Sequence, residues 1–193
     1  DHEMKDSSHD FGKDVLPLLV QGHKVYAYKF GGIQGRVTPD RYWRDVGTID
    51  AYYRANMDLL APVPPLDLYQ HNWPVRTYQQ QTPPARTIPG TSGTEGVFIN
   101  SILAGGVVIS GGNIRDSILF SGSYIDDKAI VEKSILFSDV HVGAGARLKK
   151  CIIDKSVKIP PEEKIGHDLI KDRQQFTVTE NGIVVVPHGF IFS

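Results

Sequence analysis

The sequence is poor in the residues that several common kinds of site require. Its 193 residues include one cysteine, Cys151, which excludes an internal disulfide framework or a multi-cysteine zinc site and fits a reducing, cytoplasmic compartment. Its 21 Lys and Arg almost balance 22 Asp and Glu, without the long basic run typical of nucleic-acid binding. No apolar run approaches the ~18 residues of a membrane span, and the polar start is unlike a signal peptide. We therefore expect neither nucleic-acid nor membrane partners.

Three further features limit the chemistry that we expect. The chain begins with Asp1 rather than Met, and its opening is typical of an internal segment, which predicts a piece of a longer protein. His2 and His9 lack the spacing of a helical zinc pair and the other histidines are scattered, so we assign no metal to them. Cys151 precedes Ile152 and Ile153 and is expected to pack as a small hydrophobic residue.

The second half contains an internal repeat. One phrase returns four times, beginning 16, 17 and 17 residues apart, as Ser101-Ile102-Leu103, Ser117-Ile118-Leu119, Ser134-Ile135-Leu136 and Cys151-Ile152-Ile153. A second marker recurs every 17 residues at Val108, Ile125, Val142 and Ile159. Two markers that share one period predict a coil of 16 or 17 residues.

A period of six lies inside this coil and predicts the fold. It links Ile118, Tyr124, Ile130, Leu136, Val142 and Leu148, and also Ile102, Val108, Ile114 and Phe120. Six residues fit one short strand and a turn, and three such units make a triangular coil with these side chains in its lumen. Glycines at 105, 106, 111, 112, 122, 143 and 145 are expected at the corners. The pattern predicts a left-handed parallel β-helix over residues 97–166; an antiparallel sandwich would show a period of two and variable loops.

The chain after the repeat is expected to cap or extend the β-helix. Residues 176–179 and 183–186 flank Asn181-Gly182, which predicts a final hairpin with a type I′ turn. The resulting division is a first domain over residues 1–80, a linker over 81–96, and a β-helix domain over 97–193.

The first half has helical periodicity instead. Asp10 is a candidate N-cap for a helix over residues 11–20 that Gly22 ends, and residues 25–30 read as a strand. A second helix is expected after Thr48, with Asp50 in its first turn and an apolar stripe, and Pro62 closes it; the stripe is Ala51, Tyr52, Ala55 and Leu59. Alternating helices and strands predict the end of an α/β domain.

Two polar clusters could carry chemistry. Asp45 lies in the turn of residues 42–48 before the second helix, where a carboxylate can hold Mg²⁺ beside phosphates that face the helix N–H groups; alternatively, it caps its own turn. Residues 6–14 offer the Ser8 hydroxyl and the Asp10 carboxylate to a sugar and Lys13 to a phosphate. The alternative is a capped loop before a helix.

Together these segments resemble the C-terminal portion of bacterial glucose-1-phosphate adenylyltransferases. The likeness rests on five segments: Ser-Ser-His-Asp-Phe-Gly-Lys-Asp at 7–14, Tyr-Trp-Arg-Asp-Val-Gly-Thr at 42–48, Asn-Trp-Pro-Val-Arg-Thr at 72–77, Pro-Pro-Ala at 83–85 and Gly-Val-Val-Ile-Ser-Gly at 106–111. The first domain would then be the remnant of a Rossmann-like nucleotidyltransferase domain. The resemblance implies a reaction of glucose 1-phosphate with ATP that gives ADP-glucose and pyrophosphate for glycogen synthesis.

The resemblance also implies roles for particular residues. Asp45 would be catalytic as one of two carboxylates that bind Mg²⁺, and the substrate-binding residues would be Ser8, Asp10, Phe11 and Trp43. It further implies a homotetramer controlled by phosphorylated-metabolite effectors, with Arg86, Lys149 and Lys150 as candidate regulatory contacts.

One part of the resemblance is missing from the sequence. The chain lacks a Gly-Gly-Gly-x-Gly-x-Arg-Leu loop for ATP phosphates, the second metal carboxylate and the sugar-phosphate lysine. We therefore predict that this chain alone is inactive.

The alternative is a free-standing hexapeptide-repeat module, either an acyltransferase or a non-catalytic assembly or regulatory subunit. An acyltransferase would need a histidine on the coils, and His141 is the only candidate. Strand alternation places it outside, between two inward valines.

Overall fold

Three parallel sheets form the sides of a β-helix in the computed structural model, which describes residues 8–27, 42–69, 71, 74, 76, 78 and 80–192. The first sheet has the order β1 (Arg86–Ile88), β4 (Val108–Ser110), β7 (Tyr124–Ile125), β10 (His141–Val142) and β13 (Lys158–Ile159). The second runs β14 (Lys164–Ile165), β11 (Arg147–Lys149), β8 (Ile130–Glu132), β5 (Asn113–Arg115) and β2 (Val97–Ile99). The third runs β15 (Thr177–Val178), β16 (Val184–Val186), β12 (Cys151–Ile153), β9 (Ile135–Leu136), β6 (Ile118–Leu119) and β3 (Ile102–Leu103).

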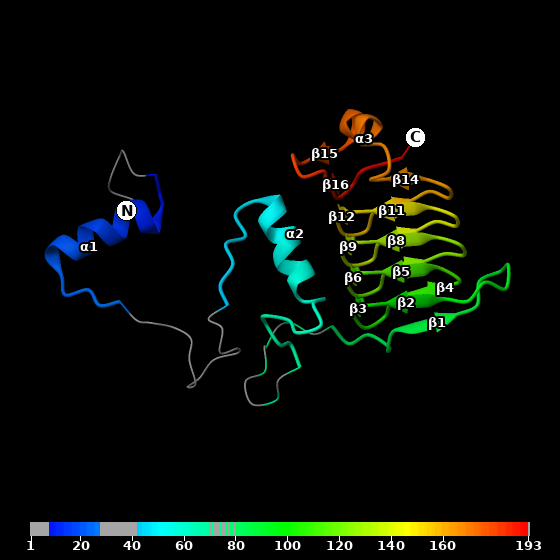
Figure 1. Cartoon of the computed structure of the whole chain (residues 1–193), viewed down its shortest axis with the longest axis horizontal. Helices are drawn as coiled ribbons and strands as arrows, with labels where there is room; N and C mark the ends of the chain where they lie inside the picture. The colour runs from blue at the N-terminus through cyan, green and yellow to red at the C-terminus, as the bar shows by residue number, and fades with distance from the viewer. Residues whose placement is uncertain are drawn as a thin grey trace.

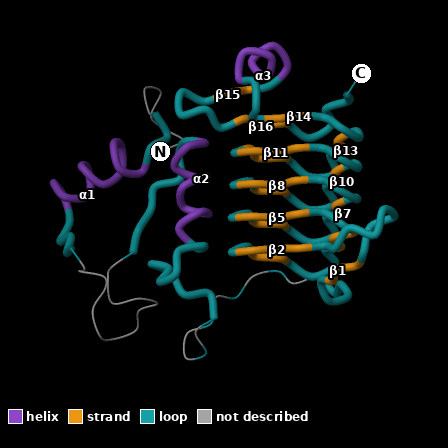
Figure 2. The backbone as a smooth tube through the Cα atoms, turned by 45° about the vertical axis from the view of Figure 1, so that its right-hand side comes forward, coloured by secondary structure: helices purple, strands orange, loops and turns teal. Residues whose placement is uncertain are grey.

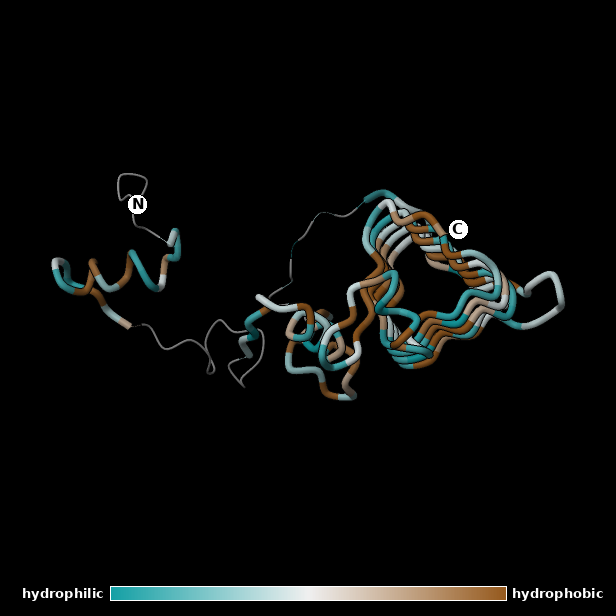
Figure 3. Tube along the Cα trace, turned by 90° about the horizontal axis from the view of Figure 1, so that it is seen from above, coloured by the Kyte–Doolittle hydropathy of each residue, from teal (hydrophilic) through white to brown (hydrophobic). Residues whose placement is uncertain are grey.

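This arrangement confirms the predicted parallel β-helix. From β1 to β14, successive strands along the chain belong to different sheets, so each sheet gains one strand per coil (Figure 1). Seen from above, the coils enclose a triangular outline (Figure 3). Among the described residues, only β15 and β16 pair antiparallel, so the sandwich alternative is wrong. Strand β1 lies inside the predicted linker and pairs with β4, so the first coil begins earlier than expected.

The lumen is filled by three columns of aliphatic side chains. Register places them one above another as Leu103, Leu119, Leu136 and Ile153; Ile109, Ile125, Val142 and Ile159; and Ile114, Val131, Leu148 and Ile165. Most of them have no exposed surface. They form one continuous hydrophobic core, which supplies most of the stability of the β-helix.

The predicted lumenal row is wrong in part. Leu136, Val142 and Leu148 are inside as expected, but Tyr124 is 36% exposed and pairs with the outward His141. From Leu119 the lumenal positions advance by six, six and five residues, to Ile125, Val131 and Leu136. A row drawn through every sixth residue therefore leaves the lumen once per coil, on the side of the triangle that has only five residues.

The repeated Ser-Ile-Leu phrase has a separate role for each member. The leucine faces the lumen, whereas the isoleucine faces outward on the third sheet. The serines stack: the Ser117 hydroxyl accepts the Ser134 N–H at 3.1 Å, and the Ser134 hydroxyl accepts the Cys151 N–H at 3.3 Å. Cys151 is buried in the fourth place of this ladder, as predicted for a small hydrophobic residue.

One corner of the triangle shows why small or polar residues occupy the turns. Gly106, Gly122, Asp139 and Ser156 occupy it in successive coils, each with φ between 60° and 77°. This left-handed backbone is natural for glycine and is tolerated by short polar residues. A Cβ on Gly106 would come within 3.3 Å of the Gly122 nitrogen of the next coil.

Two consecutive helical segments are described near the N-terminus. Asp10 caps a π-helical turn, η1 (Phe11–Val15), that leads into α1 (Leu16–Gly22), which has Pro17 in its first turn. The two segments follow each other without a gap, so the helix predicted over 11–20 is confirmed, with a π-helical first turn. Residues 24–27 form neither helix nor strand; the rest of the predicted strand at 25–30 lies outside the described residues, as do Asp6, Ser7 and most of the segment 72–77.

Helix α2 (Ile49–Asp58) confirms the second predicted helix, with Thr48 as its N-cap. It lies along the third sheet of the β-helix, beside β12, β9, β6 and β3 in Figure 1, and it stays next to the β-helix in the turned view of Figure 2. The contact buries Tyr53 with Ile135, Ile152 and Ile183, and Tyr52 and Met57 pack beside them. Two outward isoleucines of the repeat, Ile135 and Ile152, are therefore apolar because α2 covers them.

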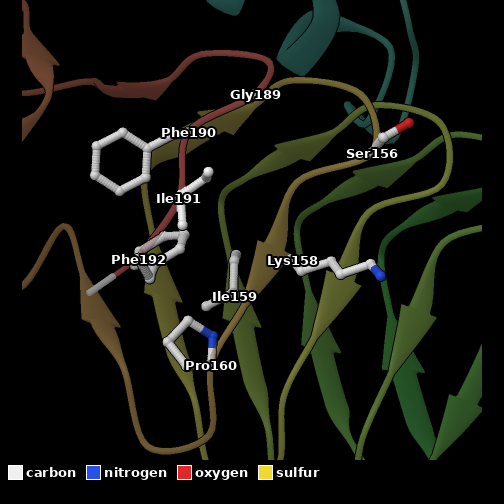
Figure 4. Close-up of a pocket in the computed structure, with 8 residues that line it drawn as sticks. All are labelled: Ser156, Lys158, Ile159, Pro160, Gly189, Phe190, Ile191 and Phe192. Carbon is white, nitrogen blue, oxygen red and sulfur yellow. The ribbon is translucent and has the colours of Figure 1, made fainter.

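The end of the chain closes the last coil. Asp168 caps α3 (Leu169–Gln175), a helix that the sequence pattern does not predict. The β15–β16 hairpin is confirmed, but only Gly182 has positive φ in its loop, so the predicted type I′ turn is wrong. Phe190 packs against both Phe176 and Phe192, and Figure 4 shows the tail beside Ile159 of β13, around a cavity of about 580 Å³. No described helix is long and apolar enough to cross a membrane.

Candidate functional site

Asp45 lies in an exposed turn directly before α2. Its Oδ1 accepts the Gly47 N–H at 3.3 Å, and the Thr48 hydroxyl accepts the Ala51 N–H at 3.1 Å at the start of the helix. The carboxylate therefore does cap its own turn. That one bond uses a small part of the acceptor capacity of two carboxylate oxygens, and solvent reaches the side chain, so Asp45 fits the role of one oxygen ligand to Mg²⁺.

An ion pair that no sequence pattern predicts holds the segment before this turn. Arg44 donates to Asp58 Oδ2 through Nε at 2.9 Å, and its second nitrogen lies 2.8 Å from the same oxygen. Hydrogen bonding to Asp58 raises the pKa of Arg44, and burial raises the pKa of the neighbouring Tyr42. Asp58 is the last residue of α2, so this ion pair holds the segment before Asp45 along the helix. The Asp45 turn is therefore anchored by Arg44 before it and by the Thr48 cap after it.

The polar cluster near the N-terminus forms local caps. The Ser8 hydroxyl donates to Asp14 Oδ2 at 2.7 Å, and Asp10 Oδ1 accepts the Lys13 N–H at 2.9 Å. Phe11 is 64% exposed. These bonds match the alternative of a capped loop before a helix, and they leave a sugar-binding role for Ser8, Asp10 and Phe11 as a prediction.

The predicted substrate-binding residues are not brought together. Trp43 and Asp45 are neighbours in one turn, and Trp43 is 70% exposed. The segment of η1 and α1, which carries Asp10 and Phe11, stands apart from α2 in both views (Figures 1 and 3). The structure thus describes two separate pieces of the predicted glucose 1-phosphate site.

The three candidate regulatory cations do not form one cluster. Arg86 is in β1 of the first coil, whereas Lys149 ends β11 in a different sheet and three coils further on, a rise of about 14 Å along the axis of the β-helix at the usual strand spacing. Lys150 follows at a corner and donates to the Asn181 carbonyl at 2.6 Å. Arg86 lines a cavity of about 420 Å³ that also includes Phe98.

The described residues offer no other group that resembles a catalytic centre. They contain no cluster of three or more His, Cys, Asp or Glu side chains arranged for a metal ion. His141 is on the outer surface as predicted, where its Nε2 lies 2.8 Å from Asp126 Oδ2. The cavity in Figure 4 has none of the predicted site residues in its lining.

Comparisons with known proteins decide the family. A family model described as "GlmU-like, C-terminal hexapeptide" matches residues 83–186, more than half of the 193 residues. The chain belongs to this hexapeptide family. A second model, described as "Nucleotidyl transferase", matches residues 1–61, the part that carries the Asp45 turn. The β-helix of this hexapeptide protein is therefore joined to a fragment of a nucleotidyltransferase domain.

Several similar proteins are named glucose-1-phosphate adenylyltransferase. The chain is 57% identical to "Glucose-1-phosphate adenylyltransferase 2" of Vibrio cholerae over 193 residues, which are 100% of this chain and 47% of the relative. It is 50% identical to "Glucose-1-phosphate adenylyltransferase" of Thermus thermophilus over 190 residues, 96% of this chain and 46% of that protein. The protein of that name in Deinococcus radiodurans is 45% identical over 192 residues, with 97% and 46% covered. The chain spans about half the length of the curated relatives it matches.

Proposed function

We propose that this chain is the C-terminal portion of a glucose-1-phosphate adenylyltransferase and supplies Asp45 as one of two Mg²⁺ carboxylates. The observation that carries the proposal is the 57% identity, over the full length of this chain, to a protein of that name. The matched region includes the Asp45 turn. The reaction is the attack of the glucose 1-phosphate oxygen on the α-phosphorus of ATP. The new P–O bond forms ADP-glucose, and the bond to pyrophosphate breaks.

The residues of this chain would act by position and charge. Mg²⁺, when bound, offsets charge on the phosphates. Asp45 projects from a turn at the N-terminus of α2, where helix N–H groups also favour anions. Asp10, Phe11 and Trp43, together with the Ser8 hydroxyl, would line the sugar-phosphate pocket once the rest of the domain orders them.

The exposed apolar residues of the first half support the proposal that a further segment packs against them. Trp43 is 70% exposed, Val46 53%, and Phe11 64%, and α1 buries none of its residues. Apolar side chains that stay exposed together on one segment are typical of an interface. The N-terminal half of the nucleotidyltransferase domain, with the Gly-rich ATP loop and the second carboxylate, is the segment that would cover it.

We expect the 193-residue chain alone to release no pyrophosphate from ATP, Mg²⁺ and glucose 1-phosphate, because it lacks the ATP loop. A fusion that places the unmatched N-terminal half of the Vibrio cholerae relative before Asp1 is expected to form ADP-glucose. A coupled pyrophosphate assay compares the two proteins at equal concentration. Measurable turnover by the chain alone would contradict the inactivity, and a folded but inactive fusion would contradict the proposed function.

Assembly and regulation are part of the same proposal. The complete enzyme would be a cytoplasmic homotetramer controlled by phosphorylated metabolites, with Arg86 and its cavity as the first contact to test. Lys149 and Lys150 would belong to a separate surface because they lie three coils away. If the protein were an acyltransferase instead, acetyl-CoA would protect His141 from modification.

A further inference from the structure

The hairpin at the end of the β-helix is hydrogen-bonded to the start of α2. The Thr179 hydroxyl donates to Asp50 Oδ1 at 3.1 Å and accepts the Ile183 N–H at 3.2 Å. Thr179 also donates its backbone N–H to the Ile183 carbonyl at 3.0 Å. One partly buried hydroxyl therefore joins the backbone of the hairpin loop to a carboxylate 129 residues earlier.

A second contact holds the middle of the same helix. The Tyr53 hydroxyl donates to the Lys133 carbonyl at 2.6 Å. Its ring is 8% exposed and packs on Ile135, Ile152 and Ile183. Burial raises the pKa of Tyr53 to about 12, so the phenol stays a donor at neutral pH. Helix α2 is thus fixed to the β-helix at its first turn and at its centre.

The Asp45 turn has little freedom of its own relative to α2. Thr48 caps the helix immediately after the turn, and Arg44 binds Asp58 at the far end of the helix. A cavity of about 370 Å³ lies between the turn and the β-helix, lined by Val46, Thr48, Phe137 and Val185 among others. A small rotation of α2 would therefore move the Asp45 carboxylate.

We propose that Thr179 is a positioning residue for Asp45. Through Asp50 it fixes the first turn of α2, and that turn orients the carboxylate that takes the metal. The inference rests on the proposed function, and it assigns a role in nucleotidyl transfer to the last hairpin of the β-helix. Positioning matters here because in-line phosphoryl chemistry tolerates little displacement of the groups that neutralise charge.

The first test uses amide hydrogen exchange in the 193-residue chain. Thr179→Val removes the hydroxyl but keeps the size and branching of the side chain. We expect exchange at residues 51–53, the first amides of α2 with hydrogen-bond partners, to rise about fivefold, the effect of losing the one net hydrogen bond to Asp50, with no change in β6 and β9. Thr179→Ser is expected to restore the native rate. Thr177→Val in the exposed position of β15 is the matched control.

A double-mutant comparison separates this role from general destabilisation. Asp50→Ala removes the other partner, so the double variant Asp50→Ala/Thr179→Val should exchange no faster at residues 51–53 than Asp50→Ala alone. Additive increases, unchanged exchange in Thr179→Val, or faster exchange throughout the β-helix would each overturn the proposal. This readout needs no enzymatic activity, so it is independent of the fate of the proposed function.

The second test uses the active fusion protein. Thr179→Val is expected to raise the half-saturating Mg²⁺ concentration severalfold and to lower kcat, with Thr179→Ser close to the native values. The control Thr177→Val should leave both unchanged. An unaltered Mg²⁺ dependence in Thr179→Val would overturn the proposal, whereas an inactive fusion would count against the proposed function alone.

Discussion

Replacement of Leu136 by Asp is expected to prevent the β-helix from folding. Leu136 has no exposed surface and lies in a central coil between Leu119 and Ile153. A carboxylate at this position would lose its hydration without gaining a partner, at a cost of several kcal/mol. That cost is comparable with the ~5–15 kcal/mol that usually stabilises a whole domain. Far-UV circular dichroism and urea denaturation of the variant measure the result.

A milder pair of variants tests the register of the lumen. Leu136→Ala should lower the free energy of unfolding by about 2–5 kcal/mol through the cavity that it leaves. Tyr124→Ala should cost less than about 1 kcal/mol, because Tyr124 is 36% exposed and loses mainly its ring contact with His141. Equal losses in the two variants would contradict the lumenal register described above.

The thiol of Cys151 is expected to react at least about 1000-fold more slowly in the folded chain than in the unfolded chain at pH 8. Burial raises the pKa of Cys151 to about 12, so the thiolate that attacks a reagent is scarce. The side chain also has no exposed surface. Reaction with a chromogenic disulfide, with and without guanidinium chloride, measures the ratio. A rate near that of the unfolded chain would contradict the burial of this thiol.

The same pKa predicts a loss of stability in alkali. Below the unfolded-state pKa of about 9 the thiol is protonated in both states, and the free energy of unfolding has its full value. As the pH rises toward 12 the thiol ionises in the unfolded chain but not in the folded chain, so stability is lost. Cys151→Ser keeps a polar atom in the serine ladder without an ionisable thiol. Between pH 8 and pH 11 the native chain should lose about 2 kcal/mol more unfolding free energy than Cys151→Ser. Equal losses in the two proteins would contradict this role of the thiol.

The fold was largely predictable because its coils correspond to a regular repeat in the sequence. A 17-residue period with two markers implies stacked coils, and the stacked serines and lumenal leucines confirm it. The residues that face the lumen were harder to predict, because each Ser-Ile-Leu phrase has two adjacent apolar residues that are apolar for different reasons. Leu119 is apolar because it fills the lumen, and Ile135 because α2 covers it. No local pattern distinguishes these two environments.

The candidate site was predictable only in its local parts. Thr48 and Asp45 lie within one turn, so sequence alone indicated a capped helix after a carboxylate. The contacts that hold this turn join Arg44 to Asp58 and Thr179 to Asp50, 14 and 129 residues apart. Such pairings depend on tertiary packing and leave no periodic signal. The short helix α3 was missed for a similar reason, because its seven residues are too few for a clear periodicity.

The most direct test of the central claim is the rate of ADP-glucose formation by the fusion protein with and without the Asp45 carboxylate. D45N keeps the capping oxygen of the turn but removes the charge, and it should lower kcat at least about 100-fold, as loss of a metal carboxylate would. Asp67 accepts the Tyr69 N–H in the same local geometry at 2.8 Å, so D67N is the matched control and should retain full activity. A D45N fusion as active as the D67N fusion would contradict the assignment of Asp45 and, with it, this account of the chain.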